Sequence, residues 1–198
     1  MAQPLITTYR WLEAHERTNY PIFRSYWDIH REHNPGFAKR LGDIQYRQLL
    51  KRLEDYTQFG ELCEIGSDLG RSTAWLSGCA NHIDVWDNDS EYMDFCRSQC
   101  YNHQKRYGPI TSVSWKLTDK NVVQVIQDLP KQYDCIKVIQ SNLEPMLPVI
   151  KGAVKQNGKF ILYEQDAILR QTFADRLDRY GLKQVSSHSF SLIIAEHK

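Results

Sequence analysis

Residues 61–89 read ELCEIGSDLGRSTAWLSGCANHIDVWDND, and the order of apolar and turn residues in this stretch decides the fold class. The mostly apolar run 62–65 predicts a buried strand, and small and polar residues follow it in a turn at 66–70. A helix is expected over 72–78. A second apolar run at 83–86 predicts another strand. The stretch therefore predicts a strand, a glycine turn, a helix and a second strand.

This order of elements predicts a concave polar site. A glycine turn between a strand and a helix N-terminus presents backbone N–H groups to a ligand. Gly66 and Gly70 suit such a turn because a side chain would block the approach of a ligand to the backbone. Asp87 follows the second strand, where a carboxylate can accept hydrogen bonds from a ribose diol.

The spacing of the turn residues separates two classes of nucleotide site. Dinucleotide-binding folds carry G-x-G-x-x-G, whereas this chain has E-x-G-x-x-x-G-x-S-T from Glu64 to Thr73. The glycine spacing thus argues against a dehydrogenase. The pattern resembles motif I of the class I S-adenosylmethionine-dependent methyltransferases.

The resemblance implies S-adenosylmethionine as the cofactor, with the glycine turn against its methionine part and Asp87 on its ribose. The cofactor-binding residues expected on this basis are Glu64, Gly66, Ser67, Asp68, Gly70, Ser72, Thr73, Asp87, Asn88, Asp119 and Gln140. In the family, the residue at the position of Asp119 contacts the adenine amino group. Asp119 is equally suited to be the N-cap of a helix expected over 121–128, and the sequence leaves both roles open.

The remaining sequence alternates strands and helices. Further strands are expected at 110–117, 133–139 and 159–163, followed by an antiparallel pair at 182–190 and 191–196. Helices are expected at 88–104 and 121–128, after 142 through Lys155, and from Ala167 to Tyr180 with Gly181 closing the last; Asn157-Gly158 is expected to be a turn. The predicted class is α/β, with a Rossmann-like seven-stranded, mostly parallel sheet, helices on both faces and an N-terminal helical extension.

Two domains are expected, an N-terminal helical segment at 1–58 and a methyltransferase domain at 59–198. The resemblance covers the second of these. The N-terminal segment is rich in aromatic residues. In small-molecule methyltransferases such a segment often covers the cofactor and helps to form the acceptor pocket. Packing of these aromatics onto the sheet is the alternative, and the two roles are compatible.

Composition narrows the class of partner and compartment. The chain has 25 Lys and Arg against 24 Asp and Glu, a formal charge of +1, so no basic excess points to nucleic acid. No apolar stretch approaches membrane-spanning length, and the first residues do not resemble a signal peptide. Five scattered cysteines fit a reducing cytoplasm. His30 and His33 could share a helix face but lack a partner ligand on it, and Cys96 with Cys100 has no second pair at matching spacing, so no metal site is expected. An acid/base role for the two histidines on the acceptor side stays open.

Within the family the chain distantly resembles the FkbM-type and sugar O-methyltransferases. Lys137, Glu144 and Glu164 match parts of the charged pattern that those enzymes carry after the fourth and fifth strands. Ile139, Ser141 and Asn142 stand where that pattern has acidic residues. Their presence argues against the divalent-metal catechol-type enzymes. Gln140, in the place of an aspartate, argues against an RNA ribose methyltransferase with a Lys-Asp-Lys-Glu tetrad.

The predicted reaction is O-methylation of a small-molecule or sugar-like acceptor. An alcohol acceptor requires a general base near it, and ligands in this fold lie at the carboxyl ends of the strands. Glu164, after the expected fifth strand, is the first candidate for the base, and His188 in the last hairpin is the second. Each residue could instead only stabilise its strand end or hairpin.

Two other functions stay open from the sequence: a catalytically inactive binding or partner protein with the methyltransferase fold, and an RNA- or protein-modifying methyltransferase. Whether the protein forms a homo-oligomer is also left open.

Overall fold

A computed structural model describes residues 59–67, 73, 80–90, 93–94, 96–98, 112–139, 144–163, 167–188 and 192–197. The expected helical segment 1–58 lies outside these residues. Among the described residues, no helix has both the length and the apolar character needed to cross a membrane.

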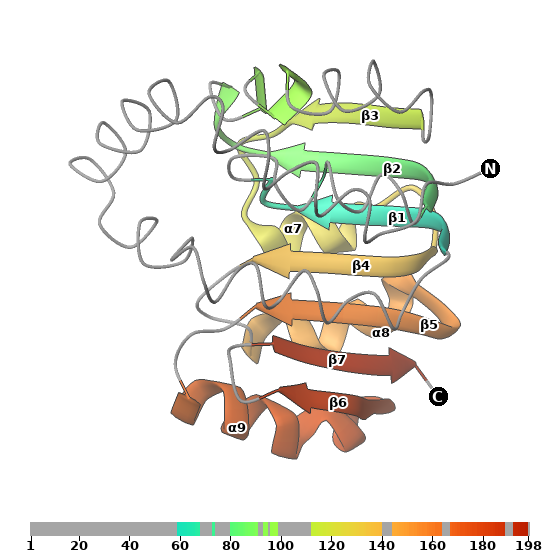
Figure 1. The fold of residues 1–198 in the computed structure, drawn as a ribbon. Helices are drawn as coiled ribbons and strands as arrows, with labels where there is room; N and C mark the ends of the chain where they lie inside the picture. The colour runs from blue at the N-terminus through green and yellow to red at the C-terminus, as the bar shows by residue number, and fades with distance from the viewer. Residues whose placement is uncertain are drawn as a thin grey trace.

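Seven strands form one sheet in the order β3-β2-β1-β4-β5-β7-β6 (Figure 1). Their bounds are β1 Phe59–Ile65, β2 Ala80–Asp87, β3 Ser112–Leu117, β4 Tyr133–Ile139, β5 Val154–Tyr163, β6 Leu182–His188 and β7 Leu192–His197. The first five strands pair in parallel, and β7 lies antiparallel between β5 and β6. The predicted mostly parallel seven-stranded sheet, with its final antiparallel pair, is confirmed.

Helices α7 (Val122–Gln127) and α8 (Leu147–Ala153) lie behind the strands in Figure 1 and cover one face of the sheet. Helix α9 (Ala167–Arg176) lies below β6 in the same view, and short 3-10 turns occur at η2 (Glu144–Met146) and η3 (Leu177–Tyr180). On the opposite face, helical residues that follow β2 include Met93 and Cys96, which are both buried. The expected helices on both faces are therefore present.

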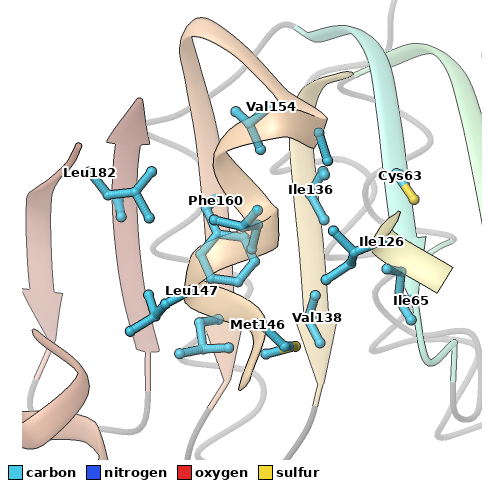
Figure 2. Close-up of a cluster of buried hydrophobic side chains, with 14 of the residues drawn as sticks. Cys63, Ile65, Ile126, Ile136, Val138, Met146, Leu147, Val154, Phe160 and Leu182 are labelled. Atoms are coloured by element: carbon cyan, nitrogen blue, oxygen red, sulfur yellow. The ribbon is translucent and has the colours of Figure 1, made fainter. Parts of the chain in front are cut away.

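Alternate residues of the central strands build the core beneath α7 and α8 (Figure 2). Cys63 and Ile65 of β1 lie in one buried cluster with Ile136 of β4 and Phe160 of β5. The clustered strand residues alternate along β1 because successive side chains point to opposite faces of a sheet. The aromatic ring of Phe173 lies 6.3 Å from that of Phe160, so α9 joins the same core.

The cap of α7 corrects one expectation. Asn121 is the N-cap, because its side chain accepts a hydrogen bond from the backbone N–H of Gln124 while the Gln124 side chain accepts one from the Asn121 N–H. This reciprocal pair is a capping box. The N-cap role considered for Asp119 is therefore wrong. At the other end of the domain, Gly181 closes η3 in a left-handed conformation with φ 71°, as predicted.

The start of β5 also differs from expectation. The helix expected through Lys155 ends at Ala153, and β5 begins at Val154, whose side chain is fully buried. Asn157-Gly158 lies inside β5, as a local irregularity. Tyr133 pairs with Val154, but Cys135 pairs with Lys159, so the intervening β5 residues bulge out of register. Asn157 has φ 63°, a left-handed conformation that asparagine adopts more readily than most residues. The same residue types are typical of turns, which is why the sequence predicts a turn here.

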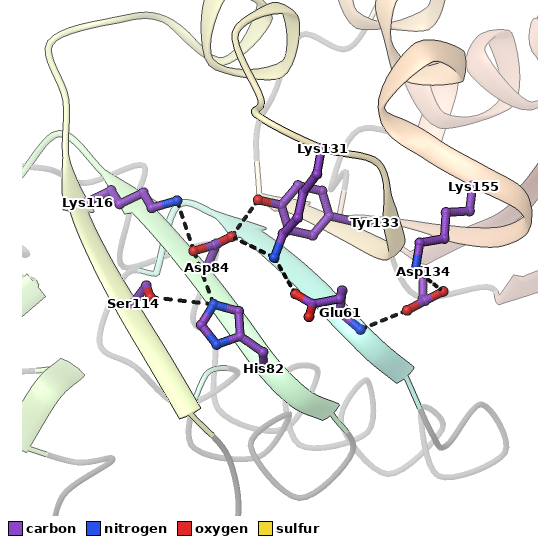
Figure 3. Close-up of polar contacts among 9 residues, drawn as sticks. All are labelled: Glu61, His82, Asp84, Ser114, Lys116, Lys131, Tyr133, Asp134 and Lys155. Carbon is purple, nitrogen blue, oxygen red and sulfur yellow. Dashed lines mark hydrogen bonds and ion pairs between the residues drawn. The ribbon is translucent and has the colours of Figure 1, made fainter.

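A polar cluster lies on the same face of the sheet, over the part of β2 and β3 that α7 and α8 do not cover (Figure 3). The buried Asp84 carboxylate accepts a hydrogen bond from the Tyr133 hydroxyl at 2.5 Å and pairs with the Lys116 ammonium at 2.9 Å. His82 lies 3.3 Å from the same carboxylate, and Lys131 lies 3.8 Å from it. The register explains this placement, because Asp84 pairs with Cys63 and therefore points toward the same face.

The pKa values of this cluster show how it is satisfied. Burial alone raises the pKa of the Asp84 carboxyl, but hydrogen bonds from Tyr133 and Lys116 outweigh it and hold that pKa below its usual range. Burial, together with the bond to Asp84, raises the pKa of Tyr133. A carboxyl with a lowered pKa in the folded state stabilises the protein above its unfolded pKa, and the stabilisation is lost as the pH falls through the folded value.

We expect Asp84→Asn to lower the free energy of unfolding by about 1–3 kcal/mol near neutral pH, because buried donors lose a charged acceptor. The difference from the wild type should shrink as the pH falls below the ordinary pKa of an aspartate and through the lowered pKa of folded Asp84, where Asp84 itself becomes protonated. Urea unfolding over this pH range measures both effects. Asp94→Asn, at a side chain that is 74% exposed, is the matched control. Equal effects of the two substitutions would contradict the role given to Asp84.

Candidate functional site

Gly66 and Ser67, the described part of the predicted glycine turn, follow β1 directly. Gly66 follows Ile65 directly and has φ 81°, a left-handed conformation that glycine adopts without steric cost. Its N–H donates to the Trp86 carbonyl at 2.9 Å, which fastens the turn to the end of β2. The turn therefore lies between the carboxyl ends of β1 and β2.

Asp87 is bound to this turn by its side chain. One carboxylate oxygen of Asp87 accepts hydrogen bonds from both the N–H and the hydroxyl of Ser67, each at 2.7 Å. The other oxygen accepts from the Asp89 N–H at 3.0 Å. The Asp87 carbonyl accepts from the Thr118 N–H at 2.9 Å, which ties the site to the end of β3. With 7% of its surface exposed, Asp87 is a buried carboxylate at the sheet edge.

A second carboxylate lies on the same face, one strand away. Glu64 is fully buried in β1 and accepts a hydrogen bond from the Lys137 ammonium of β4 at 2.5 Å. The Thr73 hydroxyl also donates to Glu64, and the Cys96 thiol lies 3.2 Å from that hydroxyl. Glu64 and Lys137 are direct partners in the parallel β1–β4 register, so their side chains emerge side by side.

The structure brings together five of the predicted cofactor residues: Glu64, Gly66, Ser67, Thr73 and Asp87. Two others, Asn88 and Asp119, are exposed and follow β2 and β3 respectively. The remaining predicted cofactor residues, Asp68, Gly70, Ser72 and Gln140, lie outside the described residues, as does Glu164.

The second candidate base, His188, ends β6. Because β6 runs in the same direction as the parallel strands, His188 lies at the same edge of the sheet as the glycine turn. Four strand spacings separate β6 from β1, which corresponds to about 19 Å. A role for His188 therefore requires an acceptor that reaches across this edge.

Lys137 was not among the predicted site residues. It is 4% exposed and lies in the middle of the otherwise largely apolar strand β4. A lysine inside a buried strand needs a charged or hydrogen-bonding partner, and Glu64 is a buried acid in the strand next to it. That pairing of residues was the available signal, but it depends on knowing that β1 and β4 are neighbours.

Comparison with known proteins gives matches among solved structures. No protein-family model and no curated protein sequence matches the chain. N-methyltransferase NodS from Bradyrhizobium japonicum superposes with a TM-score of 0.54 at 18% identity, over 82% of this chain and 95% of that chain. NodS is also solved in complex with S-adenosyl-L-homocysteine.

Two further structures extend the likeness. Ribosomal protein L11 methylase from Lactobacillus delbrueckii subsp. bulgaricus has a TM-score of 0.59 at 12% identity and covers 77% of each chain. A TehB-like S-adenosylmethionine-dependent methyltransferase from Corynebacterium glutamicum has a TM-score of 0.55 at 16% identity, over 88% of this chain and 99% of that chain. The protein therefore has the fold of the S-adenosylmethionine-dependent methyltransferases, as its sequence predicts.

We expect Thr73→Val to destabilise the protein by about 1–3 kcal/mol, because the buried Glu64 carboxylate and the Cys96 thiol both lose the Thr73 hydroxyl. Valine keeps the shape of threonine, so packing changes little. The control is Thr118→Val, where the hydroxyl accepts only an exposed bond from the Lys120 N–H in the described structure. Urea unfolding compares the two variants, and equal midpoints would argue against a buried hydroxyl bridge to Glu64.

Proposed function

We propose that the protein is an S-adenosylmethionine-dependent methyltransferase. The observation that carries this proposal is the buried Asp87 carboxylate, fixed by Ser67 beside the left-handed Gly66 at the carboxyl ends of β1 and β2. The position is the one at which open α/β sheets bind nucleotides. Support also comes from the fold, which is shared with methyltransferases that include one solved with S-adenosyl-L-homocysteine.

The donors and acceptors of the site fit this cofactor. The Asp87 carboxylate suits a ribose hydroxyl, because the oxygen that accepts from the Asp89 N–H keeps a second lone pair. The Gly66 backbone, which carries no side chain, suits close contact with the methionine part. Asp119, exposed after β3, is proposed to contact the adenine amino group. S-adenosylmethionine supplies an electrophilic methyl group when bound. The chain's own residues then have to orient the acceptor and exclude water.

We further propose that the acceptor is a small molecule carrying a hydroxyl group, such as a sugar. The near-neutral charge of the chain supports this over RNA, whose phosphates require an excess of Lys and Arg. Glu164 is the first candidate to take the hydroxyl proton, because it directly follows β5, two strands from β1 in the sheet. Segment 1–58 is proposed to form part of the acceptor pocket.

We expect the purified protein to bind S-adenosylhomocysteine with micromolar affinity in a calorimetric titration. Asp87→Ala should weaken binding by about tenfold or more, because the ribose loses a charged hydrogen-bond acceptor. Asp175→Ala is the control, since Asp175 is an exposed carboxylate on α9 that accepts a bond only from Gln171 in the described structure. Absence of binding in the wild type would overturn the cofactor assignment and leave a partner protein with this fold.

Acceptor class is tested by supplying labelled S-adenosylmethionine with sugars and other small alcohols, with RNA and with protein extracts. We expect the label in the small-molecule fraction. Glu164→Gln should lower kcat by about a hundredfold or more while S-adenosylhomocysteine binding stays unchanged, since a general base contributes to the chemical step. Label found only in RNA or protein would overturn the small-molecule acceptor.

A further inference from the structure

The buried ion pair between Lys137 and Glu64 is not explained by stability. Ion pairs inside a protein lose their hydration, and well-packed apolar residues of similar volume are often equally stabilising or better. Lys137 is 4% exposed and Glu64 is fully buried, so both ions have lost most of their hydration. The position of the pair beside the glycine turn suggests a role there instead.

The ammonium of Lys137 also reaches the glycine turn itself. Its Nζ lies 3.4 Å from the Gly66 carbonyl oxygen, in addition to the 2.5 Å bond to Glu64. Three N–H donors on an ammonium allow both contacts at once. Lys137 therefore connects β4 to the turn that ends β1.

The Gly66 carbonyl and the Ser67 N–H belong to one peptide unit. In a planar trans peptide these two groups point in opposite directions, and the described chain contains no cis peptide bond. The carbonyl end of this unit faces the Lys137 ammonium at 3.4 Å, and the N–H end donates to the Asp87 carboxylate at 2.7 Å. A cation and an anion thus hold the two ends of a single peptide plane.

We propose that Lys137 is a positioning residue of the cofactor site, which fixes the orientation of the Gly66–Ser67 peptide and through it the Asp87 carboxylate. Charged partners strengthen both hydrogen bonds, and both align with the dipole of the peptide. Glycine at position 66 has access to other backbone conformations, so without Lys137 the carbonyl end of this peptide is no longer held and its orientation is less restricted. The bond from the Ser67 N–H, one of those that orient the Asp87 carboxylate, is then weakened. We call the contacts of Lys137 and Asp87 with the two ends of the Gly66–Ser67 peptide the peptide clamp. The link to the cofactor rests on the proposed function, whereas the peptide clamp does not.

Two variants separate the effect of leaving the buried Glu64 charge unbalanced from the effect of losing the Lys137 contact with the Gly66 carbonyl. Lys137→Met leaves the buried Glu64 carboxylate without this cation and should lower the urea midpoint. Adding Glu64→Gln removes that charge, so the Glu64→Gln/Lys137→Met double variant should regain most of the wild-type midpoint. Its Ser67 amide should nevertheless exchange with deuterium about tenfold faster or more than in the wild type, because the peptide is no longer held from both ends.

The double variant should also bind S-adenosylhomocysteine about tenfold more weakly or worse. Lys155→Met is the control, because Lys155 pairs with Asp134 at 2.9 Å, outside the candidate site, and should affect neither Ser67 exchange nor binding. Wild-type exchange at Ser67 in the double variant would overturn the clamp. Wild-type binding despite faster exchange would overturn the positioning role. Faster exchange with no binding even in the wild type would retain the clamp and overturn the cofactor site.

Discussion

The parallel pairing of β1 with β2 on one side and β4 on the other is the constraint on which the rest of the structure depends. Parallel strands end at the same edge of a sheet, so this pairing brings Gly66, Asp87 and the end of β4 to one edge. The register then decides which side chains meet. Glu64 lies opposite Lys137, and Asp87 lies two residues beyond the partner of Glu64 in β2, on the same face.

Buried charged groups have different surroundings on the two faces of the sheet. Beneath α7 and α8 the central strands present an apolar core, and at β2 this core gives way to the Asp84 cluster, where hydrogen bonds and nearby cations offset the cost of burial. On the opposite face, Glu64 and Lys137 lie among buried residues that include the apolar Leu62 and Val85 and the polar Thr73. The first cluster stabilises an incompletely covered part of the sheet, and the second borders the site at the strand ends.

Sequence patterns predicted the elements formed by residues close together in the chain. They did not predict the contacts that depend on which strands are neighbours in the sheet. The strand, turn, strand and terminal Asp87 were predicted because apolar runs, glycines and a carboxylate lie within one short stretch. The Glu64–Lys137 bond joins residues 73 positions apart and requires the strand order, so it was missed. Asn157-Gly158 has the composition of a turn, but β5 begins at the buried Val154 and continues through these residues with a shift in register. The capping box of Asn121 and Gln124 was readable from the sequence, yet Asp119 was considered instead.

These contacts fix the Gly66–Ser67 backbone and the Asp87 carboxylate within the protein itself, and in the proposed function this arrangement would lower the entropic cost of binding the cofactor. The most direct test of this account is a crystal structure of the protein grown with S-adenosylhomocysteine. We expect a ribose hydroxyl within hydrogen-bonding distance of the Asp87 carboxylate, the methionine part against Gly66, and the Gly66 carbonyl still directed at Lys137. Electron density for the ligand at another place, with the Asp87 carboxylate contacting only protein, would contradict it.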